Sequence, residues 1–265
     1  EIAQCLVGSE MCIRDRENNV PFSFGISGID PETEVEIDWG NGEIETMTID
    51  NESIVRLDGN SKGTTIRISG LIDYFDCSEN DLISLDVTHN ATLATLDCYW
   101  TGITSLDLSK NPELGKLDCS YNEIGTLDLS KNTKLFSLTC YNCELTSIDL
   151  SNNTELEEAV IRNNSLSSVT LANNTKLMLL DVQNNSQLSS IDVSMLSNLQ
   201  ELQCSNMGLT SLDVTHNTQL VRLTCSNNQL TTLDLSKNTE LERLFCDGNQ
   251  LEPCLLYTSP SPRDT

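Results

Sequence analysis

Apolar residues recur with a period of 21 over residues 72–251 of this chain. Each copy reads LxxLxCxxNxLxxLDLSxNxx, so apolar and polar positions keep fixed places in the period. The first apolar position is occupied in turn by Ile72, Leu93, Leu114, Leu135, Leu156, Leu177, Leu199, Leu220 and Leu241. Every step is 21 residues except the 22 residues between Leu177 and Leu199. A single copy cannot enclose its own leucines, so successive copies must stack them into one core.

A period of about 20 to 29 residues with this order of leucines and an asparagine is the signature of a leucine-rich repeat. Within each copy the LxxLxC segment alternates inward and outward, which predicts a short strand. The predicted fold over residues 71–253 is therefore a right-handed leucine-rich repeat solenoid of about nine coils. It has a parallel β-sheet on one face and short turns or 3-10 segments on the other.

Residues 17–70 lack the repeat and predict a small all-β region. Runs such as FSFGIS, TEVEIDW and TTIRIS alternate or are rich in β-formers, and glycine-containing turns separate them. The segment from Asp38, DWGNG, resembles the WGDG hairpin of polycystic-kidney-disease-type β-sandwich domains, with Asn41 in place of the usual acid. The region is predicted to be a separate domain of that kind or an N-terminal cap for the first coil, and the two are compatible.

A cysteine column occupies the third inward position of the predicted strands. Its members are Cys77, Cys98, Cys119, Cys140, Cys204, Cys225 and Cys246. Ile161 and Val182 fill the two remaining copies, which favours buried reduced thiols used for packing, with stacked disulfides or a metal as the alternatives. Cys140 and Cys143 form a CxxC, but Cys143 stands where the repeat consensus accepts asparagine or cysteine. No metal site and no cofactor are therefore predicted.

Two polar columns complete the repeat. The asparagine column contains Asn80, Asn122, Asn164, Asn185, Asn228 and Asn249. Its inward amides are predicted to satisfy backbone groups at the turn after each strand. The aspartate column contains Asp86, Asp107, Asp128, Asp149, Asp192, Asp213 and Asp234. Its carboxylates must either be solvated and bonded to turn amides or be bridged by cations, although the spacing lacks the glycine and distal glutamate of a calcium loop.

The two ends of the chain match one DNA sequence read on opposite strands. Residues 254–264 read CLLYTSPSPRD, and codons can be chosen for them whose reverse complement encodes LVGSEMCIRD, which are residues 6–15. This DNA resembles a sequencing adapter, so residues 1–16 and 254–265 are predicted to be adapter-derived and non-native. On this interpretation the native protein is a fragment truncated within its gene, and its signal peptide and anchor cannot be seen.

Charge and motif content exclude several functions. The net charge of −25 disfavours nucleic acid and anionic membrane partners, and residues 17–253 contain no apolar run long enough for a transmembrane helix. The two histidines, His89 and His216, occupy equivalent VTHN turns and are predicted to be solvated. No nucleophile–base motif occurs, so the chain is predicted not to be an enzyme.

The repeat unit resembles the 21-residue leucine-rich repeats of secreted and surface proteins from gut bacteria, which are similar in design to internalin-type repeats. The resemblance implies an extracellular or cell-surface adhesion module that binds a protein or carbohydrate ligand, and we expect a monomer. A structural stalk, or the recognition arm of a larger truncated protein or enzyme, is the alternative.

Aromatic side chains are scarce at 5% of the chain, yet several fall at outward positions of the early coils. The candidate ligand-binding residues are Tyr99, Trp100, Tyr121, Phe136 and Tyr141. Equivalent positions of successive coils lie about 5 Å apart, which predicts a continuous aromatic strip on the sheet face. The competing interpretation is that these residues cover a junction with the N-terminal β region.

Overall fold

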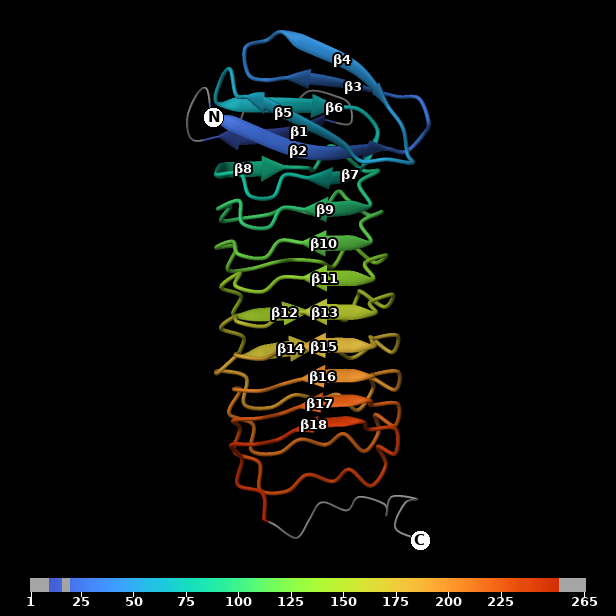
Figure 1. Cartoon of the computed structure of the whole chain (residues 1–265), viewed down its shortest axis with the longest axis vertical. Helices are drawn as coiled ribbons and strands as arrows, with labels where there is room; N and C mark the ends of the chain where they lie inside the picture. The colour runs from blue at the N-terminus through green and yellow to red at the C-terminus, as the bar shows by residue number, and fades with distance from the viewer. Residues whose placement is uncertain (1–9, 16–19, 253–265) are drawn as a thin grey trace.

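A computed structural model describes residues 10–15 and 20–252 as a stack of coils closed at one end by a group of longer strands (Figure 1). The described residues form eighteen strands and no helix. None of them therefore forms a helix long and apolar enough to cross a membrane. The predicted leucine-rich repeat solenoid is confirmed.

The main sheet runs along the length of the stack with one short strand from each coil. Its coil strands are β7 (Ile72–Asp76), β9 (Thr95–Asp97), β10 (Lys116–Asp118), β11 (Ser137–Thr139), β13 (Glu158–Val160), β15 (Leu179–Asp181), β16 (Glu201–Gln203), β17 (Arg222–Thr224) and β18 (Arg243–Phe245). They pair in parallel with each leucine opposite its equivalent, as Leu96 lies opposite Leu117 and Leu117 opposite Leu138. The opposite side of the stack consists mainly of turns, with one short parallel pair, β12 (Ser147–Asp149) and β14 (Ser168–Thr170).

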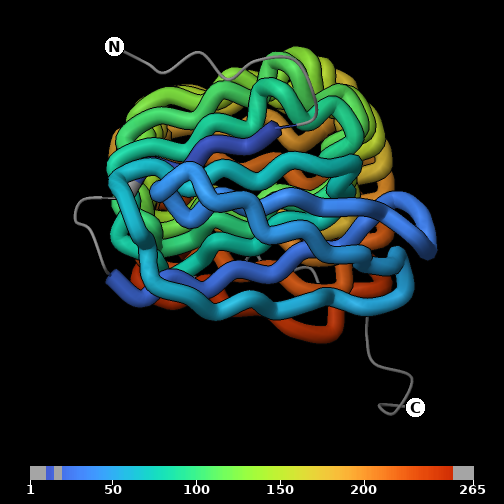
Figure 2. The backbone as a smooth tube through the Cα atoms, turned by 90° about the horizontal axis from the view of Figure 1, so that it is seen from above, coloured from blue at the N-terminus to red at the C-terminus, as the bar shows by residue number. Residues whose placement is uncertain are grey.

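The N-terminal strands extend both sides of the first coil. They are β2 (Pro21–Gly28), β3 (Thr33–Asp38), β4 (Ile44–Ile49), β5 (Val55–Asn60) and β6 (Thr65–Ser69). Strand β2 pairs antiparallel with β7 and then with β5, so the main sheet continues past the first coil. A second sheet has the order β4-β3-β6-β1-β8, in which β1 is Glu10–Asp15, and ends on β8 (Leu82–Asp86), which belongs to the first coil. These strands cross the end of the stack, as Figure 2 shows.

The WGNG segment forms the turn of a hairpin. Strands β3 and β4 pair antiparallel, and the Asp38 carboxylate between them accepts the backbone N–H groups of Gly40 at 2.8 Å and Gly42 at 2.9 Å. Trp39 is buried and donates its indole N–H to Glu45 at 3.1 Å. The turn is thus held by its own side chains, while its kinship with any particular domain type stays a prediction.

Residues predicted to be non-native contribute a strand to this end. Strand β1 (Glu10–Asp15) lies between β6 and β8 and pairs antiparallel with both. Its Met11 and Ile13 side chains are fully buried. The adapter origin of residues 1–16 stays a prediction, but residues 10–15 are packed like an integral strand. Residues 254–265, the other predicted adapter segment, lie outside the described residues.

One hydrophobic core runs from the N-terminal strands to the last coils. It joins Met11 and Phe24 to the leucines of every coil and includes most of the cysteine column. All eight cysteines of residues 20–252 are free thiols, and every one except Cys246 is buried. This arrangement confirms that the cysteine column packs inside the core.

The asparagine column forms the predicted ladder of hydrogen bonds. In a typical coil, Asn122 donates from Nδ2 to the carbonyl oxygens of Cys98 at 2.8 Å and Cys119 at 2.9 Å, and its Oδ1 accepts the backbone N–H of Gly102 at 2.8 Å. Each amide therefore joins two coils and satisfies groups that would otherwise be buried without partners.

A second asparagine ladder, which was not predicted from the sequence, lies on the other side of the core. Its members are the asparagines of the LSxN segments: Asn90, Asn111, Asn132, Asn153, Asn174, Asn217 and Asn238. Asn132, for example, donates to the carbonyl oxygens of Leu108 at 3.1 Å and Asn111 at 2.9 Å in the preceding coil. The second asparagine of the repeat motif indicated this ladder, because it recurs in nearly every copy.

The aspartate column lies at the surface and caps the turns. Asp128 accepts the backbone N–H of Ser130 at 2.9 Å, and the same bond recurs from Asp86 to Asp234. That hydrogen bond holds the pKa of Asp128 below its usual value. Bonding to turn amides, one of the two possibilities predicted for this column, is observed, while bridging by cations stays a prediction.

Candidate functional site

The turn directly after each coil strand requires a left-handed backbone conformation. The third residue after the strand has a φ of 54 to 57° where it is Asn142, Asn163, Asn184, Asn206 or Asn227. Asparagine and glycine tolerate this region best, whereas a bulky side chain there is uncommon. In the early coils the same position holds Trp100, with φ 51°, and Tyr121, with φ 55°. Two large aromatic residues therefore occupy backbone positions that disfavour them.

Both of these aromatic residues lie open to solvent. Trp100 is 66% exposed and Tyr121 is 50% exposed. The Tyr121 ring meets the Tyr141 ring edge-on at a centroid distance of 5.0 Å, and the Arg162 guanidinium stacks over Tyr141 at 4.9 Å. The Tyr121–Tyr141 pair is thereby fixed in place, while Trp100 keeps a free face.

A shallow hollow of about 400 Å³ opens between these rings and the next turns. Its aromatic wall is Trp100 and Tyr121, and the remaining lining residues are Asn122, Glu123, Asn142, Glu144, Asn163, Asn164 and Ser165. The other side of Trp100 borders a second hollow that also contains Glu79 and Asp81. Trp100 thus separates two hollows, and each of them carries carboxylates. We call the surface formed by both hollows the turn-edge surface.

Tyr99 has a different role from the other candidates. It is only partly exposed, and its phenolic O–H donates a hydrogen bond to the Glu79 carboxylate. This bond, together with some burial, raises the pKa of Tyr99 to about 12. Tyr99 therefore borders the turn-edge surface and orients Glu79 rather than offering a free ring.

Phe136 does not belong to the same surface. It stands just before β11, five residues ahead of Tyr141, or roughly 16 Å along an extended strand. Its ring covers Gly115, where an added Cβ would lie 2.8 Å from the ring. The prediction of one continuous strip is therefore wrong for Phe136, since the strand carries it to the opposite edge of the sheet. The other four residues lie together at the edge where the coil strands end.

The sheet face beside these aromatic residues is acidic. Asp76, Asp97 and Asp118 occupy equivalent positions of β7, β9 and β10. Asp76 forms an ion pair with Arg56 at 2.8 Å, while burial raises the pKa of Asp97. Neighbouring like charges disfavour ionisation of these three carboxyl groups. A cationic group bound against them would therefore stabilise their charged form.

The junction interpretation applies to a different tyrosine. Tyr74 lies on β7 beside β2, and its ring is close to Gly25 of β2: a Cβ added to Gly25 would lie 3.6 Å from the ring. The phenolic O–H of Tyr74 donates a hydrogen bond to Asp97 at 3.3 Å. Trp100 and Tyr121 lie farther along the stack and are exposed, so the N-terminal strands do not cover them. Sequence reasoning missed the strain at these two positions, although their replacement of the usual asparagine was a visible signal.

Comparison with solved structures supports the same architecture. The functional domain of InlJ from Listeria monocytogenes, described as including a cysteine ladder, is 33% identical with a TM-score of 0.68, over 69% of this chain and 42% of that one. The chain thus spans less than half of that structure. Internalin C2 of Listeria monocytogenes is 17% identical with a TM-score of 0.50, over 69% of this chain and 74% of that one. YopM, a leucine-rich effector protein of Yersinia pestis, is 21% identical with a TM-score of 0.54, over 68% of this chain and 52% of that one.

No family model and no curated protein matches the sequence. The fold nevertheless defines the class: this chain is a leucine-rich repeat solenoid whose structural neighbours include internalin-type proteins. Its cysteine column is similar to the cysteine ladder reported for InlJ.

Proposed function

We propose that this chain is a non-catalytic binding module whose ligand is a segment of another protein. The turn-edge surface is the binding site, with Trp100 and Tyr121 as its anchors. One observation carries the proposal: these are exposed aromatic residues in a left-handed turn that asparagine occupies in the later coils. Placing a bulky residue there costs on the order of 1 kcal/mol. The ring contact with Tyr141 offsets part of that cost for Tyr121, whereas the exposed Trp100 ring makes no such contact among the described residues.

The shape and stiffness of the site suit protein recognition. Tryptophan and tyrosine offer large contact areas with few rotatable bonds, and they dominate the energetics of many interfaces. The Tyr121–Tyr141–Arg162 stack keeps one wall of the site rigid before a ligand arrives. Less ordering is then required on binding, which favours affinity.

The chemistry around the anchors favours a cationic ligand side chain. Glu123 and Glu144 border the hollow on one side of Trp100, and Glu79 and Asp81 border the hollow on the other side. A lysine or arginine lying against the Trp100 ring would meet both the aromatic face and these carboxylates. The partner is therefore a protein segment that presents at least one basic residue. A neutral carbohydrate would use the ring but not the charges.

The setting proposed for this module is the cell surface or the extracellular space, by analogy with the internalin-type neighbours. A structural stalk, or the recognition arm of a larger protein, is the second candidate function, and the linear stack of coils favours it because such a stack can act as a spacer.

The test is a selection of random peptides displayed on phage against the full chain. Enriched peptides are expected to share a lysine or arginine. Trp100→Asn and Tyr121→Asn should each weaken their binding by about 10- to 100-fold, which corresponds to roughly 1–3 kcal/mol. The matched control is Phe245→Thr, since Phe245 is an exposed aromatic residue of the last coil at a position where Thr139 and Thr224 stand in other coils.

Enrichment of peptides that bind the Trp100→Asn, Tyr121→Asn double variant equally well would contradict the proposed site. A glycan array run in parallel tests the carbohydrate alternative. Glycan binding that depends on Trp100, with no peptide enriched, would replace the protein ligand by a sugar.

A further inference from the structure

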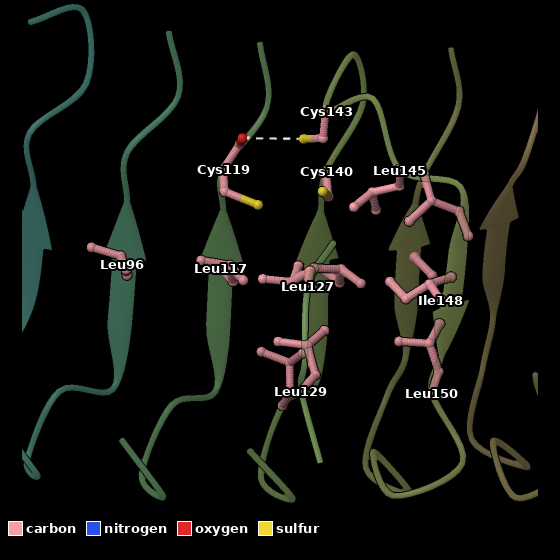
Figure 3. Packing of buried hydrophobic residues seen from close by; sticks show 14 of the residues in the cluster. Leu96, Leu117, Cys119, Leu127, Leu129, Cys140, Cys143, Leu145, Ile148 and Leu150 are labelled. Carbon is pink, nitrogen blue, oxygen red and sulfur yellow. Dashed lines mark hydrogen bonds between the residues drawn. The ribbon is translucent and has the colours of Figure 1, made fainter. Parts of the chain in front are cut away.

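Three cysteine thiols converge inside the solenoid below the turn-edge surface. Cys119 and Cys140 are successive members of the cysteine column, while Cys143 comes from the asparagine column of the same coil as Cys140. Their Sγ atoms all lie within 4.8 Å of one another, and all three side chains are buried (Figure 3).

The convergence results from one substitution in the ladder. In the preceding coil, Asn122 donates its amide to the carbonyl oxygen of Cys98. Cys143 replaces that bond with its thiol, which donates to the carbonyl oxygen of Cys119 at 3.2 Å (Figure 3). The cysteine column alone supplies one thiol per coil, and Cys143 was attributed from the sequence to the repeat consensus, so no metal site was predicted. In the structure Cys143 adds a third sulfur from the turn to those of Cys119 and Cys140.

We propose that Cys119, Cys140 and Cys143 bind one soft monovalent metal ion, with Cu⁺ as the representative case. Three sulfurs around one ion at ~2.3 Å lie ~4 Å apart, so the sulfurs need to move by less than about 1 Å. Thiolates select Cu⁺ and Zn²⁺ over harder ions, but a structural zinc site takes four ligands in a tetrahedron. The group formed by the described residues offers three.

Binding exchanges thiol protons for the metal. Each cysteine that ligates as thiolate releases one proton to solvent, so affinity must fall as the pH falls. With two thiolates and one neutral thiol as ligands, a monovalent ion leaves a single negative charge in the core.

The turn that carries Cys143 separates the three sulfurs from the hollow of the turn-edge surface. Asn142 and Glu144 flank Cys143 in the chain, and both line the hollow of the turn-edge surface. Asn122 and Asn164, the ladder neighbours of Cys143 in the coils before and after it, line the same hollow. Opening this one turn would expose the three sulfurs without separating the coils.

The test is a titration of the full reduced chain with Cu⁺ under anaerobic conditions. Cu⁺ is supplied as its weak acetonitrile complex, and binding is read from the near-ultraviolet thiolate-to-copper absorption and from competition with bicinchoninate. We expect one Cu⁺ per chain and weaker binding at lower pH. Cys143→Asn restores the consensus residue, so this variant should fold, as checked by circular dichroism. It should lose at least about tenfold in affinity, because even partners outside the ligand set are worth 10- to 100-fold.

The matched control removes a thiol of the same column outside the cluster. Cys204→Val introduces the residue type found at the equivalent position one coil earlier, Val182. This variant should leave Cu⁺ affinity and stoichiometry unchanged. Equal Cu⁺ uptake by Cys143→Asn, or an equal loss in Cys204→Val, would show binding by the cysteine column at large and overturn the proposal. Stoichiometric Zn²⁺ binding without Cu⁺ binding would overturn it as well.

Discussion

The early and late coils share one core but differ in the turn after the strand. In the late coils the turn asparagines bond to one another: Asn184 donates to Asn163 at 2.6 Å, and Asn206 donates to Asn184 at 2.8 Å. In the early coils Trp100 and Tyr121 replace them and face solvent. Stacking between coils restricts the residue types at the inward positions. The turn position tolerates residues that serve binding instead, at a modest conformational cost.

The two ends of the stack differ in a second way. At the early end β2 and β5 extend the main sheet, and Phe75 of the first coil is completely buried. At the other end Leu244 and Cys246 are only partly buried. Within the described residues, the first coil is covered on both sides and the last coil on one side only. The two coils share the sequence pattern, but we expect them to differ in local stability.

The largest expected effect concerns the strand that completes the early end. Replacing Met11 and Ile13 together by aspartate should lower the free energy of unfolding by about 3 kcal/mol or more, because both side chains are fully buried. Urea unfolding of the full chain measures the loss. Arg14→Gln is the control, since Arg14 is exposed on the same strand. An unchanged midpoint in the double variant would show that β1 is not integral, as the adapter interpretation expected.

The turn comparison predicts a gain in stability in one direction and a loss in the other. Trp100→Asn should raise the free energy of unfolding by about 1 kcal/mol, because asparagine tolerates the left-handed backbone better. Asn206→Trp should lower it by a similar amount and also breaks the bond to Asn184. Urea midpoints of both variants measure the pair. A loss of stability in Trp100→Asn would mean that the ring stabilises the fold and that the strain argument fails.

A local effect should distinguish the two ends without any substitution. The backbone amides of residues 241–251 should exchange with deuterium fastest within the solenoid, because the described residues cover the last coil on one side only. Of the cysteines in residues 20–252, Cys246 should also be alkylated first in the native state, while Cys77 and Cys98 react after unfolding. Equal alkylation rates for all of these thiols would remove the difference between the ends.

The smallest effect concerns acid stability. The Asp128 pKa is lowered in the folded protein by the Ser130 backbone N–H, so its contribution is present above the unfolded value of 3.8 and is lost as the pH falls through the folded value. The contribution of Asp97 to stability has the opposite sign, because burial raises its pKa. The charged carboxylate destabilises the folded protein, and its protonation removes that destabilisation. Asp97→Asn should therefore raise the urea midpoint at pH 7, whereas Asp128→Asn should lower it slightly. The reverse pattern would contradict both assignments.

The sequence was sufficient for most of the features that repeat, with the second asparagine ladder as the exception. The leucine columns, the buried cysteines and the ladder through Asn122 follow from period and inward alternation, and the structure confirms them. Single-coil features were harder to predict. Phe136 was grouped with Tyr141 because both point outward, although position along the strand places them at opposite edges.

Two further features depend on geometry that a one-dimensional pattern does not contain. The left-handed φ of Trp100 becomes visible only once the turn is built. The approach of Cys143 to Cys119 depends on the distance between neighbouring coils rather than on the CxxC spacing itself.

The asparagine ladders also bear on how such a chain changes length during evolution. From the second coil on, the ladder amides bond within their own coil or to the coil before it, as Asn153 does with Leu129 and Asn132. Duplication or deletion of one 21-residue unit in the gene therefore leaves every new neighbour with the partner it requires. Unequal recombination between copies would yield folded longer or shorter variants, each shifting Trp100 and Tyr121 by a whole coil relative to the far end of the stack.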